Sequence, residues 1–195
     1  MKIKISFLFF AVLTLLFIVD TKGLAVISLL CAALHEMGHI LAMICFKNTP
    51  DEIVLGIFGI RMQQNKYTLS DLQQGVVVLC GPLVNIALSM ISLLISLALE
   101  GDTMLMVSAV NLVMALFNLL PIMPLDGGRI LTLLLNRFFS ERTAQKIMRI
   151  TCVLLLFALV VSGAFLAIQT GFNVSLLATG AYLCALCIKS IRIGY

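Results

Sequence analysis

Long apolar stretches alternate with short polar segments along almost the whole chain. Six of these stretches approach the roughly 20 residues that a helix needs to cross a bilayer. They span residues 5–19, 23–46, 73–99, 103–123, 147–168 and 172–189. We find no internal repeat, low-complexity tract or flexible linker between them. The pattern predicts an all-α polytopic membrane protein with about six transmembrane helices, folded as a single membrane-embedded domain over residues 1–195.

Two connections are longer than the others, at about residues 47–72 and 127–146. Within the first, residues 52–68 are rich in β-branched side chains and are interrupted by glycine, which disfavours a helix. We therefore expect a short membrane-associated β-hairpin between the second and third helices, with a plain cytoplasmic loop as the other interpretation. An exposed strand edge there could hold a substrate in an extended conformation by β-addition.

Composition and charge agree with a membrane environment. The 195 residues are 62% hydrophobic and 11% charged, with a mean hydropathy of +1.15, whereas soluble domains carry about 25% charged residues. When the six stretches are laid alternately across a bilayer, all lysines and arginines except Lys22 fall on one side. This positive-inside pattern predicts a multi-pass protein of the cell membrane with cytoplasmic N- and C-termini, rather than a nucleic-acid-binding protein. Residues 18–22 offer no small-residue cleavage site, so we expect the first stretch to be an uncleaved anchor.

Six cysteines lie in or at the edge of the apolar stretches. We interpret them as small buried hydrophobic residues rather than as disulfides. Cys184 and Cys187 have a metal-like spacing, but no second pair accompanies them, so this spacing is weak evidence for a metal site.

Both histidines of the chain stand four residues apart in the second stretch, as His35-Glu36-Met37-Gly38-His39. Because a helix turns by about 100° per residue, the two imidazoles project from one face, one turn apart, and can bind one zinc ion. Glu36 lies about 60° from His39, where it suits a general base acting on water. An acid near a bilayer centre costs about 2.5–3.5 kcal/mol or more, so this group indicates compensation by a metal or cavity rather than satisfied polar residues alone.

A third zinc ligand must come from another segment, since no third histidine exists, and Asp126 is the candidate. It follows residues 118–125, Asn-Leu-Leu-Pro-Ile-Met-Pro-Leu, where two prolines interrupt helical hydrogen bonding. Such broken backbone at membrane depth is tolerated where it is buried in protein or lines a cavity. The second and fourth stretches both run inward, so His39 and Asp126 are expected near the same boundary. The other interpretation of Asp126 is an ordinary acid before a Gly-Gly turn.

These two segments resemble the signature segments of the site-2 proteases, a family of intramembrane zinc metalloproteases, and the likeness extends to residues 81–85, Gly-Pro-Leu-Val-Asn. It covers nearly the whole chain. Within the family the chain most resembles the bacterial sporulation type, which processes a membrane-associated pro-sigma factor. The resemblance implies that His35, His39 and Asp126 bind Zn²⁺ and that Glu36 activates water. We expect no inserted PDZ domain and no C-terminal CBS domain, which leaves the substrate open.

The predicted function is therefore intramembrane hydrolysis of a peptide bond in a membrane-associated or transmembrane protein, in regulated proteolysis of a pro-sigma or anti-sigma factor. Expected partners are the membrane, this protein substrate and an inhibitory membrane partner, without nucleic acid. Asn85 and Asn118 are the polar residues that segment order best places to bind the oxyanion or to position the substrate. A structural hydrogen bond between helices is an equally open role for each asparagine.

Two alternative functions fit parts of this pattern. An ion or proton transporter could use Glu36 and Asp126 as relays in broken helices, although the missing repeat symmetry argues against it. A haem protein is disfavoured because His35 and His39 project from one face of one helix and cannot lie on opposite sides of one porphyrin.

Overall fold

The computed structural model describes residues 2–5, 20, 23–48, 52–56, 59–63, 69–123, 125–170 and 175–193. These residues form six helices and three strands. The chain divides into two compact units, Met1–Phe117 and Asn118–Tyr195.

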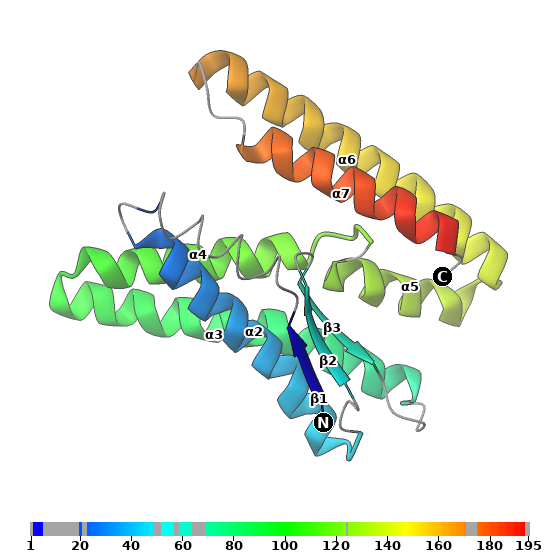
Figure 1. The fold of residues 1–195 in the computed structure, drawn as a ribbon, viewed down its shortest axis with the longest axis horizontal. Helices are drawn as coiled ribbons and strands as arrows, with labels where there is room; N and C mark the ends of the chain where they lie inside the picture. The colour runs from blue at the N-terminus through cyan, green and yellow to red at the C-terminus, as the bar shows by residue number, and fades with distance from the viewer. Residues whose placement is uncertain are drawn as a thin grey trace. The chain divides into compact units, whose positions relative to one another are not determined.

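The first unit is built on three apolar helices, α2 (Leu24–Cys45), α3 (Asp71–Leu99) and α4 (Asp102–Asn118). Helices α3 and α4 run side by side in opposite directions, and α2 packs against α3 (Figure 1). A hydrogen bond between two serines joins α3 to α4: Ser108 Oγ donates to the Ser89 carbonyl oxygen at 2.9 Å. Hydrogen bonds between polar side chains and backbone are a common means of joining helices inside a membrane.

Local sequence explains where α2 and α3 begin. The carboxylate of Asp20 accepts hydrogen bonds from the backbone N–H groups of Leu24 and Ala25, at 3.0 and 2.7 Å. Ser70 and Gln73 form a capping box at the start of α3, each side chain accepting from the other's backbone N–H. Both arrangements satisfy N–H groups that lack a partner in the first helical turn.

Three strands form a small sheet in the same unit, in the order β1, β2, β3. Strand β1 (Lys2–Ile5) pairs in parallel with β2 (Glu52–Gly56), and β2 pairs antiparallel with β3 (Gly59–Gln63). The β2–β3 pair falls inside the segment 52–68, where the sequence predicts a hairpin. Strand β1 was not predicted, and Ile5, expected to begin the first transmembrane helix, belongs to it.

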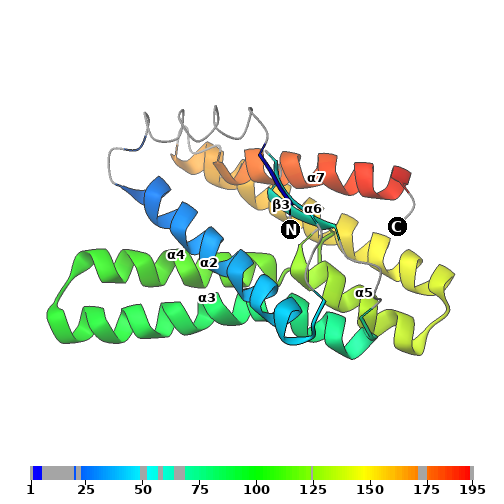
Figure 2. The ribbon, with the colours of Figure 1, turned by 60° about the horizontal axis from the view of Figure 1, so that its bottom comes forward.

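The second unit contains α5 (Asp126–Phe138), α6 (Glu141–Thr170) and α7 (Ser175–Ile193). Helices α6 and α7 run antiparallel beside one another in two views (Figures 1 and 2). Their close approach depends on glycine. A Cβ atom added to Gly163 would lie 2.9 Å from the backbone nitrogen of Leu177, and one added to Gly180 would lie 2.8 Å from the Leu159 side chain.

One predicted boundary is wrong, and one predicted connection contains a helix that was not foreseen. Residues 127–146 were expected to connect two membrane segments, and α5 occupies most of that range. The fourth segment was expected to continue to residue 123, whereas α4 ends at Asn118. Most of the first predicted stretch, residues 6–19, lies outside the described part of the chain.

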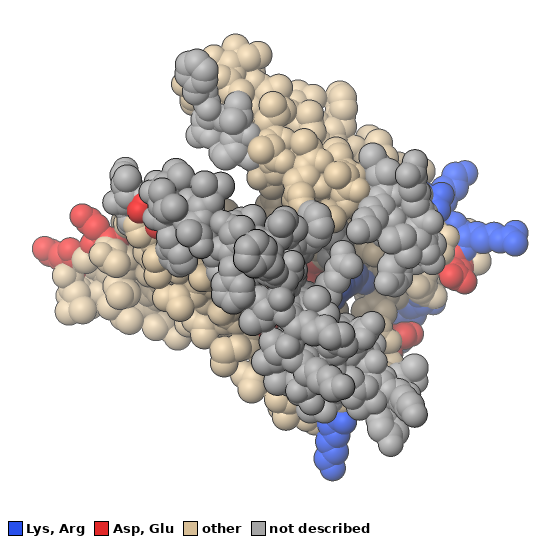
Figure 3. Space-filling view, viewed as in Figure 1, with Lys and Arg blue, Asp and Glu red and all other residues tan. Residues whose placement is uncertain are grey.

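The described helices have the length and surface of membrane helices. Helices α2, α3 and α6 are each long and apolar enough to cross a bilayer, while α4 and residues Leu176–Cys187 are shorter apolar helices. Large apolar side chains point outward, among them Leu97 and Phe157, which are 72% and 69% exposed. Most of the described surface in Figure 3 is neither acidic nor basic. Lipid is the solvent that suits such a surface, so this is a membrane protein.

Candidate metal centre

The two histidines face each other inside the first unit. His35 and His39 project from the same side of α2, and their side chains are buried, 4% and 8% exposed. Their Nε2 atoms lie 3.2 Å apart, and the rings meet edge to face with centroids separated by 4.8 Å. The spacing of four residues thus places two ring nitrogens side by side, as predicted from helix geometry.

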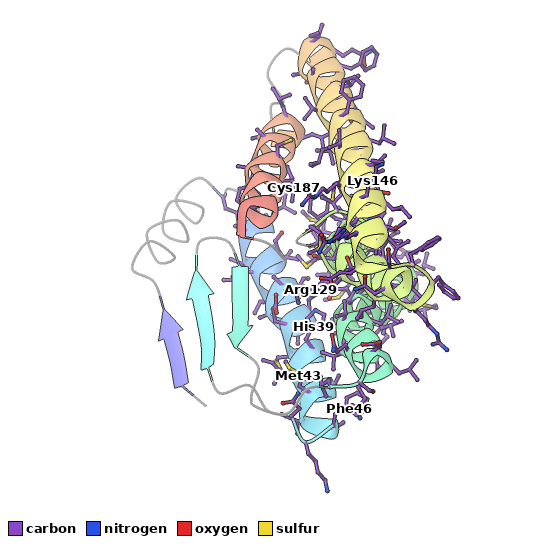
Figure 4. The ribbon with its side chains drawn as sticks, turned by 90° about the vertical axis from the view of Figure 1, so that its right-hand side faces the viewer. His39, Met43, Phe46, Arg129, Lys146 and Cys187 are labelled. Carbon is purple, nitrogen blue, oxygen red and sulfur yellow. The ribbon has the colours of Figure 1, made fainter. Side chains whose placement is uncertain are left out.

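The backbone of α3 fixes the ring of His39. Its Nδ1 lies 2.8 Å from the carbonyl oxygen of Val77. A carbonyl oxygen can only accept, so Nδ1 carries the proton, and in the neutral ring Nε2 keeps its lone pair. Metal-binding histidines commonly donate the second ring N–H in this way, which orients the ring and makes it a better ligand. Figure 4 shows His39 on α2, one turn before Met43.

Two glycines leave the space that the imidazole rings and the close helix packing require. A Cβ atom on Gly81 of α3 would collide with the Nε2 of His39 and would lie 2.8 Å from that of His35. On α2, a Cβ atom on Gly38 would lie 2.8 Å from the carbonyl oxygen of Cys80. Only glycine at both positions allows α2 and α3 to approach so closely.

The histidine pair has the geometry that a tetrahedral zinc site requires. Two ligands bound at 2.0–2.1 Å to one tetrahedral zinc ion lie about 3.3 Å apart. The observed Nε2 separation of 3.2 Å fits this value. Two imidazole nitrogens, one ring being oriented by a backbone carbonyl, are also ligands that suit zinc.

Asp126 belongs to the second unit, where it is the first residue of α5 and 8% exposed. The preceding turn is compact, since the N–H of Leu125 donates to the Ile122 carbonyl oxygen at 2.8 Å. A Cβ atom on Gly127 would collide with the backbone of Leu119, so the chain folds tightly around this acid. An acid in the first helical turn is also favoured by the helix dipole.

The remaining predicted residues have different surroundings. Glu36 is half-buried on α2, directly after His35. Asn85 lies one turn beyond Gly81 on α3 and is completely buried, and neither its Oδ1 nor its Nδ2 has a hydrogen-bond partner among the described residues. Asn118 is half-buried at the end of α4.

Sequence reasoning missed two groups that shape the histidine pair. The Val77 carbonyl belongs to the backbone, so no side-chain pattern reveals it. Gly81 was noted only as part of a family resemblance, and its role in making room for the rings was not foreseen. A glycine inside a long apolar helix is the signal that could have indicated close packing.

Comparison with known proteins gives one consistent relationship. Residues 102–159 match the model of peptidase family M50. Zinc metalloprotease MJ0392 of Methanocaldococcus jannaschii is 28% identical over 130 residues, which cover 64% of this chain and 38% of that protein. Stage IV sporulation protein FB of Bacillus subtilis is 28% identical over 122 residues, which cover 61% of this chain and 42% of that protein. The chain is thus similar to peptidases of family M50 over part of its length.

The M50 relationship extends to the fold. The solved site-2 protease from Methanocaldococcus jannaschii superposes with a TM-score of 0.68 at 22% identity, covering 97% of this chain and 91% of that one. The predicted resemblance to the site-2 protease family, and to its sporulation type, is thereby confirmed. The chain spans about two fifths of the length of the curated M50 relatives that it matches.

Proposed function

We propose that the chain is an intramembrane zinc metalloprotease that hydrolyses a peptide bond of a membrane-associated or transmembrane protein. One observation carries the proposal: two buried imidazole nitrogens lie 3.2 Å apart on a membrane-length helix, directly beside a glutamate. The named relatives, one of them called a zinc metalloprotease, support the same chemistry.

The proposed zinc ligands are His35, His39 and Asp126. Two histidines and one carboxylate are a common ligand set of catalytic zinc sites, and they leave a fourth position open. Asp126 is the candidate for the third ligand because it is buried, begins a helix after the proline-rich turn and lies within the segment that matches the M50 model.

Zinc bound there supplies a Lewis acid that polarises the scissile carbonyl and makes water acidic enough to react at neutral pH. Glu36 accepts the proton of the attacking water and delivers it to the leaving amine. The Val77 carbonyl keeps the proton of His39 on Nδ1, so its Nε2 remains available as a ligand.

Asn85 and Asn118 are the proposed substrate-positioning residues. The buried side chain of Asn85 presents a donor and an acceptor with no partner among the described residues, and such groups cost about 1–3 kcal/mol when left unsatisfied. An extended peptide offers the complementary carbonyl and N–H groups, either to bind Asn85 or to pair with a strand edge of a membrane-associated β2–β3 hairpin.

The proposal also includes the membrane topology and the partners. The topology is six membrane spans in a single domain of the cell membrane, with cytoplasmic N- and C-termini. The partners are a pro-sigma or anti-sigma factor as substrate and an inhibitory membrane protein. The distribution of lysine and arginine supports the orientation. The sporulation protein among the relatives supports this class of substrate.

Metal content tests the site directly. Mass spectrometry of the detergent-purified chain should find about one zinc per wild-type molecule and none after His35→Ala, His39→Ala or Asp126→Ala. The matched variant Glu36→Gln should keep zinc and lose cleavage of a membrane-tethered peptide substrate, because its ligands remain while the base is gone. A wild type that stays zinc-free after zinc reconstitution, or a fully active Glu36→Gln enzyme, would overturn the proposal. Metal-dependent ion flux in proteoliposomes without cleavage would favour the transporter instead.

A further inference from the structure

The antiparallel pair α6–α7 has a clear register, set by its glycines. Gly163 packs against Leu177, and Gly180 packs against Leu159 and Val160. Because the helices run in opposite directions, each step back along α6 matches a step forward along α7. Continued by two turns, the register brings Cys152 of α6 opposite Cys187 of α7.

The side chains agree with this register. The thiols of Cys187 and Cys152 interact with each other, and they are 6% and 1% exposed. Both are free thiols. Figure 4 shows Cys187 on α7. Two buried, interacting thiols at matching positions of facing helices are candidates for a disulfide.

Cys152 has a second contact, which leads to the loop before Asp126. Its sulfur accepts a hydrogen bond from the backbone N–H of Met123 at 3.3 Å. Met123 lies in the compact turn between Ile122 and Leu125, three residues before the proposed zinc ligand. The Cys152 sulfur therefore links the thiol pair to the loop that carries Asp126.

We propose that Cys152 and Cys187 are an oxidation site, where a reversible disulfide releases Met123 from Cys152 and loosens the loop that carries Asp126. The structural part stands on the second unit alone, whereas the effect on zinc rests on the proposed function of Asp126. In the reduced state the loop is held, and in the oxidised state it is freed.

A peroxide is the class of oxidant that fits. One thiolate attacks a peroxide oxygen, the O–O bond breaks, and a sulfenic acid and hydroxide form. The second thiol then attacks the sulfenic sulfur, which forms the S–S bond and releases water. Overall, two thiols and one hydrogen peroxide give one disulfide and two waters. Hydrogen peroxide is small and uncharged, which suits a thiol pair that is buried between two helices.

Disulfide formation moves the Cys152 sulfur to about 2.05 Å from that of Cys187 and leaves it a weaker acceptor. The Met123 N–H then loses its partner. A typical hydrogen bond contributes about 1 kcal/mol, so the Met123 amide should exchange with solvent about fivefold faster.

The experiment uses the full chain in detergent, treated with hydrogen peroxide and then with an alkylating agent. Peptide mass spectrometry should find a Cys152–Cys187 disulfide that dithiothreitol reverses. Hydrogen–deuterium exchange in residues 119–126 should accelerate about fivefold on oxidation, and zinc should pass faster to a chelator. In Cys187→Ala, which keeps the Cys152 sulfur, neither peroxide effect should occur, while Cys184→Ala should respond like wild type.

The oxidation site, its coupling to the loop and the role of Asp126 are contradicted by different results. Peroxide-treated protein with no Cys152–Cys187 disulfide, or with a Cys184–Cys187 disulfide instead, overturns the oxidation site whatever the zinc content. A Cys152–Cys187 disulfide with unchanged exchange in residues 119–126 overturns the coupling to the loop. Faster exchange in a chain that binds no zinc upholds the oxidation site and counts against the proposed role of Asp126.

Discussion

The helix pairs α2–α3 and α6–α7 use the same device for different purposes. In both, glycines let two apolar helices approach closely: Gly38 and Gly81 in the first pair, Gly163 and Gly180 in the second. The first pair encloses two imidazoles and a buried amide, whereas the second encloses leucines and thiols. Close packing at glycines therefore does not by itself indicate a functional site. The side chains enclosed between the two helices determine what chemistry each pair can support.

Gly81→Ala should break the first pair most severely. The added methyl would occupy the space of both imidazoles, and overpacking of this kind costs roughly 1–3 kcal/mol. We expect zinc affinity to fall by a factor of about 5–150, measured by competition with a chelator. Gly75→Ala is the matched control on the same helix, because a Cβ atom there meets nothing within 4 Å. Full zinc affinity in Gly81→Ala would show that the rings do not need this glycine.

Gly180→Ala should weaken the second pair without affecting the first. The methyl would press against Leu159 and Val160, so the free energy of unfolding should fall by roughly 1–3 kcal/mol while zinc content stays unchanged. Thermal unfolding in detergent and metal analysis measure the two quantities. Ala181→Leu, at an exposed position of α7, is the control and should leave stability nearly unaltered. Unchanged thermal stability in Gly180→Ala would contradict the tight packing of α6 against α7 at this glycine.

Asn85→Leu sharpens the comparison by removing a polar group from the first pair. The Asn85 amide has no partner among the described residues, so its replacement by an apolar group of similar size should change the free energy of unfolding by less than about 1 kcal/mol. If Asn85 positions substrate, the cleavage rate should fall about tenfold, which corresponds to about 1.4 kcal/mol. A strongly destabilised but fully active variant would instead make Asn85 a structural residue. Asn111→Leu removes an amide that is bonded to Cys31 and Val107, and should be the more destabilising change.

Hydrophobic length predicted α2 and α3 to within two residues at each end, since both have nearly unbroken apolar sequences. It missed α5, which is amphipathic and charged at both ends and therefore reads as a connection when only transmembrane segments are sought. Strand β1 was missed because it has only four residues and pairs with a strand about fifty residues later. Such pairing depends on tertiary structure rather than on local pattern.

The candidate metal site shows the same distinction between features that local sequence determines and features that depend on tertiary contacts. The spacing of His35 and His39 was sufficient to predict their shared face, because helix geometry alone determines it. The orientation of the His39 ring depends on α3, which follows in the chain after the strands, so no local pattern could predict it. The role of Asp126 remains a prediction from motif and topology.

The bond from His39 to the Val77 carbonyl has a consequence for mutational tolerance. A backbone carbonyl is present whatever the side chain, so no ordinary substitution at residue 77 can delete the acceptor. Alanine scanning would therefore pass over this contact, even though it sets which ring nitrogen is free. The orientation of His39 is robust to substitutions at residue 77, whereas changes that move α3 or fill the space of the ring would disturb it.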